Sequence, residues 1–189
     1  MNALYLLALL GNSWVLLAIL AGAFIAQFAM GEPPCPLCVM QRIAMMLAAL
    51  GPCYTLLTAQ REGLTARVIA IGAGMTVLAS LLGAAISIRQ VLLHILPGDP
   101  GFGAPIFGFH LYTWAVIAFA CTIAASGAQL LGLQWFAGSA TRLIPGARLT
   151  GFVLGVMLVA NILSVVAEAG FAWRLPDNPT RYLLFSQSS

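Results

Sequence analysis

Two cysteines, Cys35 and Cys38, are the residues best suited to chemistry, because a Cys-x-x-Cys pair can close one disulfide. Pro33 and Pro34 come directly before the pair and favour an extended backbone, so we expect the pair at the start of a helix. The partial positive charge of a helix N-terminus stabilises a thiolate, which is the nucleophile of thiol–disulfide exchange. The spacing therefore predicts a redox-active pair.

Arg42 follows Cys38 by four residues, which places it one turn further along the same face of the predicted helix. A guanidinium at this position can stabilise a sulfur anion. It can also donate hydrogen bonds to a carbonyl oxygen of a molecule lying at the same depth. Arg42 is therefore a candidate for supporting both a thiolate and a carbonyl-bearing ligand.

Three other uses of the cysteine pair can be compared with redox use. A structural zinc site needs four ligands, which here would require His94 and His110, because the chain has no second Cys-x-x-Cys. A c-type haem would need a histidine straight after the second cysteine, where Val39 stands. The pair could also be two unreactive thiols. Redox use is the preferred interpretation, and no metal site is expected.

Composition sets the environment in which this pair must work. The chain has 189 residues, of which 61% are hydrophobic and only 7% are charged, whereas about a quarter of a soluble domain is charged. This excludes a soluble enzyme and a disordered protein, and a net charge of +3 without a basic stripe gives no reason to expect nucleic-acid binding. Because the apolar runs are continuous rather than alternating, we expect an all-α integral membrane protein.

Five stretches are long and apolar enough to span a bilayer, which takes about 20 residues. We predict spans at residues 13–30, 39–59, 68–93, 111–133 and 149–171. Residues 4–10 would be an overhang of the first span, set off by the polar break at 11–13. The first span lacks the positive n-region of a signal peptide and is longer than its apolar core, so we expect a retained helix.

Arginine placement predicts the orientation, because the chain contains no lysine. Two connections between spans carry arginine, namely Arg61 and Arg67 in one, and Arg142 and Arg148 in the other. The positive-inside rule places these connections and the N-terminus in the cytoplasm, and the cysteine pair outside, where disulfides persist. Arg174 and Arg181 in the C-terminal tail argue mildly against this arrangement.

The segment Cys35-Pro-Leu-Cys38-Val-Met-Gln-Arg42, placed between the first two spans, resembles the bacterial DsbB family of disulfide bond formation proteins. Residues 87–97 are similar to the segment that leads into the second periplasmic loop of that family, and the resemblance covers roughly residues 13–134. It implies a four-helix bundle in the bacterial inner membrane. Such a bundle oxidises periplasmic thiols and passes the electrons to a membrane quinone, either ubiquinone or menaquinone.

The resemblance also implies roles for individual residues. Cys38 would face the quinone and react with it, Cys35 would exchange with a periplasmic DsbA-like protein of thioredoxin fold, and Arg42 would support the quinone and the thiolate. Arg89 and His94 are further candidates for the quinone site, since charge inside a membrane is costly and quinone reduction requires protons. Arg89 could instead form an ion pair with Glu168, or extend to the interface as His94 could.

The chain departs from the family in two respects. Family members that oxidise DsbA carry a second cysteine pair between the third and fourth helices, and residues 93–111 contain no cysteine. Cys53 and Cys121 do not replace that pair, because we expect both to be buried and inert. Three explanations remain. A partner supplies the second pair, a partner thiol attacks Cys35 directly, or the protein no longer oxidises DsbA.

The second departure is a fifth span followed by a tail with an apolar cluster at residues 182–185. We therefore divide the chain into residues 1–136 as a DsbB-like bundle, 137–172 as a cytoplasmic loop and fifth helix, and 173–189 as an outside tail. The cluster could dock on a partner or the membrane surface, and the alternative is a tail that merely lies at the interface. An alternative function follows, that of a non-catalytic accessory subunit docking on a larger membrane complex.

Overall fold

The computed structural model describes residues 2–138, 146–170, 179 and 182–186. Five helices in it are long and apolar enough to cross a membrane, which confirms the all-α membrane class and the fifth span. They are α1 (Asn2–Ala29), α2 (Pro36–Glu62), α3 (Ala66–Leu93), α4 (Leu111–Leu131) and α6 (Ala147–Ala169). Two short helices, α5 (Leu133–Phe136) and α7 (Leu183–Ser186), complete the described elements.

Most helix ends differ from the predicted ones, and three of the differences have a local cause. Helix α1 is continuous through residues 11–13, because the Ser13 hydroxyl bonds the Leu9 carbonyl one turn back at 2.9 Å and so stays inside the helix. Helix α2 already begins at Pro36, a residue well suited to a first helical position. The fourth span ends at Leu131, where the chain turns at Gly132 into α5.

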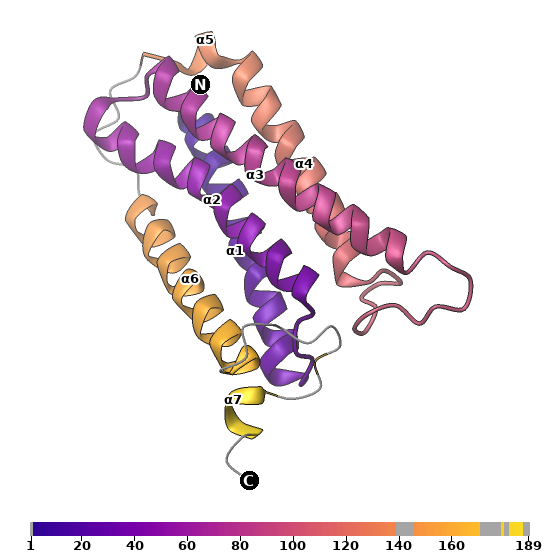
Figure 1. Cartoon of the computed structure of the whole chain (residues 1–189). Helices are drawn as coiled ribbons and strands as arrows, with labels where there is room; N and C mark the ends of the chain where they lie inside the picture. Colours follow the sequence, from indigo (N-terminus) through magenta and orange to yellow (C-terminus); the bar gives the residue numbers. More distant parts are fainter. Residues whose placement is uncertain (1, 139–145, 171–178, 180–181, 187–189) are drawn as a thin grey trace.

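Helix α2 is the centre of the bundle, with α3 and α4 on one side and α1 and α6 on the other (Figure 1). Leucines of α1 pack with methionines and alanines of α2 and with Phe119 of α4 in the main core. Helices α1 and α4 both border α2 but make few contacts with each other, which leaves a groove between them. The fifth helix does not extend this groove, because it packs on α1 and α2.

The two ends of the bundle differ in charge. Exposed Arg61, Arg67 and Arg148 all lie at the end where α2 finishes and α3 and α6 begin, whereas the cysteine pair lies at the opposite end. The C-terminal helix α7 lies at the cysteine end (Figure 1). The other residues used to predict the orientation or the tail's position, Arg142, Arg174 and Arg181, lie outside the described residues, as does Phe171 at the predicted end of the fifth span.

Two glycines bring α2 and α3 into close contact. A Cβ atom on Gly72 of α3 would overlap the Thr55 hydroxyl and lie 2.8 Å from the Gly51 carbonyl oxygen of α2, and a Cβ on Gly51 would meet the Gly72 carbonyl and Thr76. Backbone groups cannot move aside as a flexible side chain can. The depth of the α2–α3 contact therefore depends on the absence of a side chain at these positions.

We expect Gly72→Ala to destabilise the protein by roughly 1–3 kcal/mol, the usual cost of forcing an extra group into a packed contact. Gly74→Ala, two residues further on the same helix, is the matched control, because a Cβ there meets nothing within 4 Å. It should be neutral or stabilising by up to about 1 kcal/mol, since alanine favours a helix over glycine. Thermal unfolding of both variants in detergent measures the difference, and equal effects would contradict this close contact.

Candidate functional site

The cysteine pair sits at the N-terminus of α2, as the sequence predicts. Cys35 is the N-cap residue with an extended backbone (φ −67°, ψ 163°), and its Sγ accepts a hydrogen bond from the Cys38 N–H at 3.2 Å. Cys38 lies in the first turn of the helix, and both thiols are free. Cys35 thus takes the place of the serine or aspartate that usually caps a helix, and both sulfurs lie where the helix dipole favours negative charge.

The two thiols are not equivalent. Cys35 is buried, whereas Cys38 is partly exposed in the structure. The contact between the Cys35 and Cys38 thiols and the burial of Cys35 raise the pKa of the Cys35 thiol above the ordinary value, and together they outweigh the Cys38 N–H, which acts in the opposite direction. In the reduced pair Cys35 therefore keeps its proton at neutral pH, and Cys38 is the sulfur available to carry negative charge.

Gln90 of α3 contacts both sulfurs, which sequence reasoning missed. Its Nε2 lies 3.4 Å from the Cys35 Sγ and 3.5 Å from the Cys38 Sγ, and the side chain is buried. Gln41 of α2 donates to the Gln90 Oε1 at 2.8 Å, so the Gln90 amide presents its N–H groups to the cysteines. The available signal was a second polar side chain beside Arg89 within a membrane span.

Arg42 is buried at the same end of the bundle and is fixed by three contacts. Its guanidinium donates to the Gln27 Oε1 at 2.6 Å and to the Ala23 carbonyl at 2.8 Å, and lies 5.0 Å from the centre of the Phe24 ring. All three partners belong to α1. A desolvated guanidinium held against an aromatic face in this way is a fixed positive charge near Cys38.

A network of polar side chains extends from Arg42 to the fifth helix and the tail. The Gln27 Nε2 donates to the Ser164 Oγ of α6 at 2.6 Å and to the Tyr182 hydroxyl at 3.2 Å. The Tyr182 ring also stacks on Phe28 at 6.4 Å between centroids. Docking on a partner or the membrane surface was one interpretation of the apolar cluster of the tail. In the described part of the tail, Tyr182 instead packs on this chain's own bundle.

Two hollows flank the cysteine pair. A groove of about 80 Å³ between α1 and α4 is lined mostly by apolar side chains, together with Glu32, Cys38, Gln41 and Arg42. A second hollow of about 480 Å³ lies on the other side and is bounded by Cys35, the end of α3 and the following loop. Gln90 lines the second hollow but contacts both sulfurs. Each cysteine therefore borders a different hollow, one apolar and one more polar.

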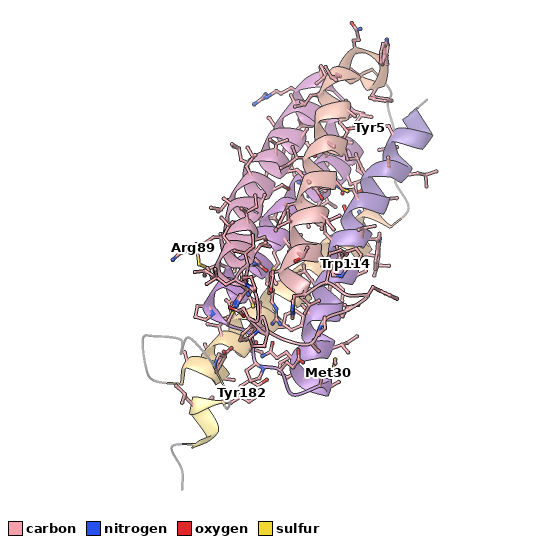
Figure 2. The ribbon with its side chains drawn as sticks, turned by 90° about the vertical axis from the view of Figure 1, so that its right-hand side faces the viewer. Tyr5, Met30, Arg89, Trp114 and Tyr182 are labelled. Carbon is pink, nitrogen blue, oxygen red and sulfur yellow. The ribbon has the colours of Figure 1, made fainter. Side chains whose placement is uncertain are left out.

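The structure does not bring Arg89 to Arg42. Arg89 is exposed, points away from the bundle (Figure 2), and lines the hollow beside Cys35. The alternative of an ion pair between Arg89 and Glu168 is wrong, because Glu168 is buried on α6, and α6 lies on the other side of α2 from α3, which carries Arg89. Neighbouring positions on a helix point about 100° apart, so facing Gln90 to the sulfurs turns Arg89 outward.

The two histidines have partners in the loop. The His94 Nδ1 lies 3.0 Å from the Asp99 Oδ1, and the His110 Nδ1 lies 3.0 Å from the Gly103 carbonyl, while both rings stack on Tyr112. The Gly101 N–H and His94 lower the pKa of Asp99 below its ordinary value. Within the described ranges no three His, Cys, Asp or Glu side chains gather as a metal site would require, which leaves the zinc alternative without a ligand set.

The two remaining cysteines lie apart from this site. Cys53 is buried in the core as expected, packed with side chains of α1, α4 and α6. The expectation that Cys121 is buried is wrong, because it is exposed on α4. Helices in a membrane present apolar surface to lipid, so a small apolar side chain has no reason to turn inward.

We expect Gln90→Leu to slow oxidation of the cysteine pair about tenfold, because a hydrogen bond to a charged group contributes at least about 1.5 kcal/mol and leucine cannot replace it. Stopped-flow measurement of thiol loss in the purified protein gives the rate. Arg89→Leu, the neighbouring exposed residue, is the matched control and should leave the rate within a factor of about two. A larger effect at Arg89 than at Gln90 would contradict this site.

Five apolar helices and a Cys-x-x-Cys at the start of one of them define a multi-pass membrane protein with a dithiol site at one end of its bundle. A family model described as "Disulfide bond formation protein DsbB" matches residues 3–103, which include α1, α2, α3 and both cysteines of the pair. The chain belongs to the DsbB family of disulfide bond formation proteins. No solved structure matches it.

Curated relatives carry the same family name. Disulfide bond formation protein B of Burkholderia thailandensis is 32% identical over 156 residues, covering 67% of this chain and 88% of that protein. The protein of that name from Chromobacterium violaceum is 42% identical over 77 residues, covering 41% and 44%. Disulfide bond formation protein B 1 of Pseudomonas fluorescens strain Pf-5 is 31% identical over 139 residues, covering 58% and 79%.

Proposed function

We propose that this protein is a thiol:quinone oxidoreductase of the bacterial inner membrane. It takes electrons from a periplasmic dithiol protein of thioredoxin fold through Cys35 and passes them to ubiquinone or menaquinone beside Cys38. The observation that carries this proposal is the position of the pair between two hollows of different character. A soluble partner requires polar surroundings, and an apolar electron acceptor requires apolar ones. Cys35 borders the more polar hollow, and Cys38 borders the apolar groove.

The groove beside Cys38 suits a quinone headgroup. A quinone is a flat apolar ring with two carbonyl acceptors, and the groove offers apolar walls with donors from Gln41 and Arg42. It lies between two membrane helices that make few contacts with each other, so an apolar molecule could enter from the bilayer. When bound, the quinone supplies a two-electron acceptor, and Arg42 stabilises negative charge that develops beside it.

The hollow beside Cys35 suits an incoming thiol. A partner thiolate attacks the Cys35 sulfur, the Cys35–Cys38 bond breaks, and Cys38 leaves as a thiolate. The helix N-terminus, the Gln90 amide and Arg42 all stabilise this leaving group. The second thiolate of the partner protein then attacks the partner sulfur of the mixed disulfide, so that Cys35 leaves and takes up a proton. The partner is oxidised by two electrons, which now reside on the reduced pair.

Direct attack on Cys35 also accounts for the missing second cysteine pair. The loop after α3 has no cysteine, yet it is held close to the pair, because the Glu32 Oε1 accepts a hydrogen bond from the Ala104 N–H at 3.2 Å. Asp99, Pro100 and Gly101 of that loop form the outer wall of the hollow beside Cys35. We propose that this wall receives the partner and that no internal disulfide relay is used.

We also propose that the cysteine end faces the periplasm and the arginine end the cytoplasm, in line with the positive-inside rule. The accessory-subunit alternative was based on the fifth helix and the tail. In the described residues both contact the dithiol end of this chain's own bundle through Ser164 and Tyr182. These contacts support a role within the redox site rather than docking on another complex.

The direct test is a quinone reduction assay. Purified protein in detergent is given a reduced thioredoxin-fold dithiol protein and a short-chain ubiquinone or menaquinone, and quinone absorbance is followed. We expect catalytic turnover by the wild type and only the uncatalysed rate from the double variant Cys35→Ser/Cys38→Ser, with Cys53→Ser as the matched control at the wild-type rate. Turnover by the double variant equal to the wild type would overturn the proposal.

A further inference from the structure

Glu168 of α6 is a buried carboxylate that the proposed function does not use. Its side chain is 0% exposed, and neither carboxylate oxygen has a hydrogen-bond partner among the described residues. Leaving a buried carboxylate without partners is costly, so such a group usually serves a purpose beyond packing. It lies outside residues 3–103, which match the family model.

Glu168 and Arg42 are the only charged side chains that are buried in the described part of the chain. They interact electrostatically, but no ion pair joins them, because the guanidinium donates instead to the neutral oxygens of Gln27 and Ala23. Arg42 interacts in the same way with Cys38. Cys38, Glu168, Tyr182 and Cys35 are all within electrostatic reach of the buried cation, and the first two are the strongest candidates for its compensating anion.

The other groups near Arg42 and Glu168 can be named element by element. Helix α2 contributes Cys38, which interacts with both, and Cys35 at its cap, which interacts with Arg42. The segment before α7 contributes Tyr182, which also interacts with Arg42, and α1 contributes the neutral Gln27, which bonds Arg42. Arg174, Asp177 and Arg181 lie outside the described residues. One buried cation compensates one anion, and two anions at this depth would repel each other and lose hydration. A single anion beside Arg42, on Cys38 or on Glu168, is therefore favoured over two.

We infer that Glu168 takes up a proton when the cysteine pair is reduced and releases it when the pair is oxidised. One negative charge then stays beside Arg42 throughout the cycle. This inference rests on the proposed function. In the reduced state Cys35 is a thiol, Cys38 is a thiolate and Glu168 is a neutral acid. In the oxidised state the Cys35–Cys38 disulfide has no charge, and Glu168 is a carboxylate.

Atoms and electrons balance over both half-reactions. When a partner dithiol reduces the disulfide, its two protons go to Cys35 and Glu168, its two electrons go to the pair, and Cys38 becomes the anion. When the pair is reoxidised, two electrons leave it, a sulfur–sulfur bond forms, and the protons of Cys35 and Glu168 supply the two protons that a quinone takes up. The charge of the site is the same before and after each step.

The test follows the carboxyl group itself in a quinone-free preparation. Infrared difference spectra of the wild type, recorded as a phosphine reduces the disulfide, should show the C=O band of a protonated carboxylic acid appearing. The band should be absent in Glu168→Gln and shifted in frequency in Glu168→Asp, which keeps the carboxyl. Glu62→Gln, at the exposed far end of α2, is the matched control and should keep the band unchanged.

A second readout counts protons. The midpoint potential of the wild-type pair should follow pH with two protons per two electrons, and that of Glu168→Gln with one, so its dependence on pH is half as steep. A wild type without the band, a band that persists in Glu168→Gln, or equal pH dependence in both proteins would overturn the inference. The proposed function would fail in a different experiment, if the wild type did not reduce quinone. Neither readout used here depends on quinone reduction.

Discussion

Replacing Cys38 by serine should abolish quinone reduction, lowering turnover by at least about 10³-fold, since loss of the nucleophile in a covalent mechanism costs factors of this size or more. Cys38 is the sulfur at the apolar groove, and it is the one that can carry negative charge while Cys35 holds its proton. Serine keeps the size of the side chain but not a stable anion. The assay is the absorbance of a short-chain quinone in the presence of a reduced dithiol partner.

The single variants Cys38→Ser and Cys35→Ser also test how the two cysteines divide their roles. With the disulfide form of the partner, Cys38→Ser should form a mixed disulfide through Cys35, because Cys35 borders the hollow that is open to the loop side. Cys35→Ser should form little, because Cys38 lines the apolar groove. Non-reducing gel electrophoresis separates the two cases. A mixed disulfide that forms mainly on Cys38 would show that the roles are reversed.

Replacing Arg42 by methionine should lower the rate of quinone reduction about 10²–10³-fold, the usual cost of removing a donor that stabilises charge developing in the reaction. Methionine retains most of the side-chain length but leaves the Gln27 carbonyl oxygen and the Ala23 carbonyl without their donor. It also removes the fixed charge beside Cys38. The quinone KM should rise together with the loss of kcat, because Arg42 lines the groove itself.

Two controls separate charge from position in this experiment. Arg42→Lys keeps a charge but not the forked donor geometry, so its rate should fall between those of the wild type and the methionine variant. Arg61→Met removes an exposed arginine from the far end of α2, away from both hollows, and should stay within a factor of about two of the wild type. Equal losses in Arg61→Met and Arg42→Met would contradict the assignment of Arg42 to the groove.

The sequence predicted the parts of this molecule that depend on local chemistry. Continuous apolar runs determine five spans, and prolines before Cys35 mark the start of a helix, so both could be read along the chain. The four-residue step from Cys38 to Arg42 is a property of one helix and held in the structure. The predicted first span was too short, because a serine whose hydroxyl bonds a carbonyl of its own helix does not interrupt that helix.

Contacts between helices could not be predicted in this way, because they depend on how each helix is rotated. Arg89 was the stronger candidate by charge, yet Gln90 faces the sulfurs. Cys121 was expected inside, although hydropathy does not distinguish a lipid-facing position from a buried one in a membrane protein. The proximity of Glu168 to Arg42 joins residues 126 positions apart and appears only once α6 packs on α1 and α2.

Thiol trapping in intact membranes tests the central claim most directly. Cells are quenched with acid, free thiols are alkylated with a reagent that adds mass, and the state of Cys35 and Cys38 is read from gel mobility in a Cys53→Ser/Cys121→Ser background. The pair should be a disulfide while oxidised quinone is supplied and should accumulate as thiols when the quinone pool is depleted. A pair whose redox state ignores the quinone supply would contradict this account.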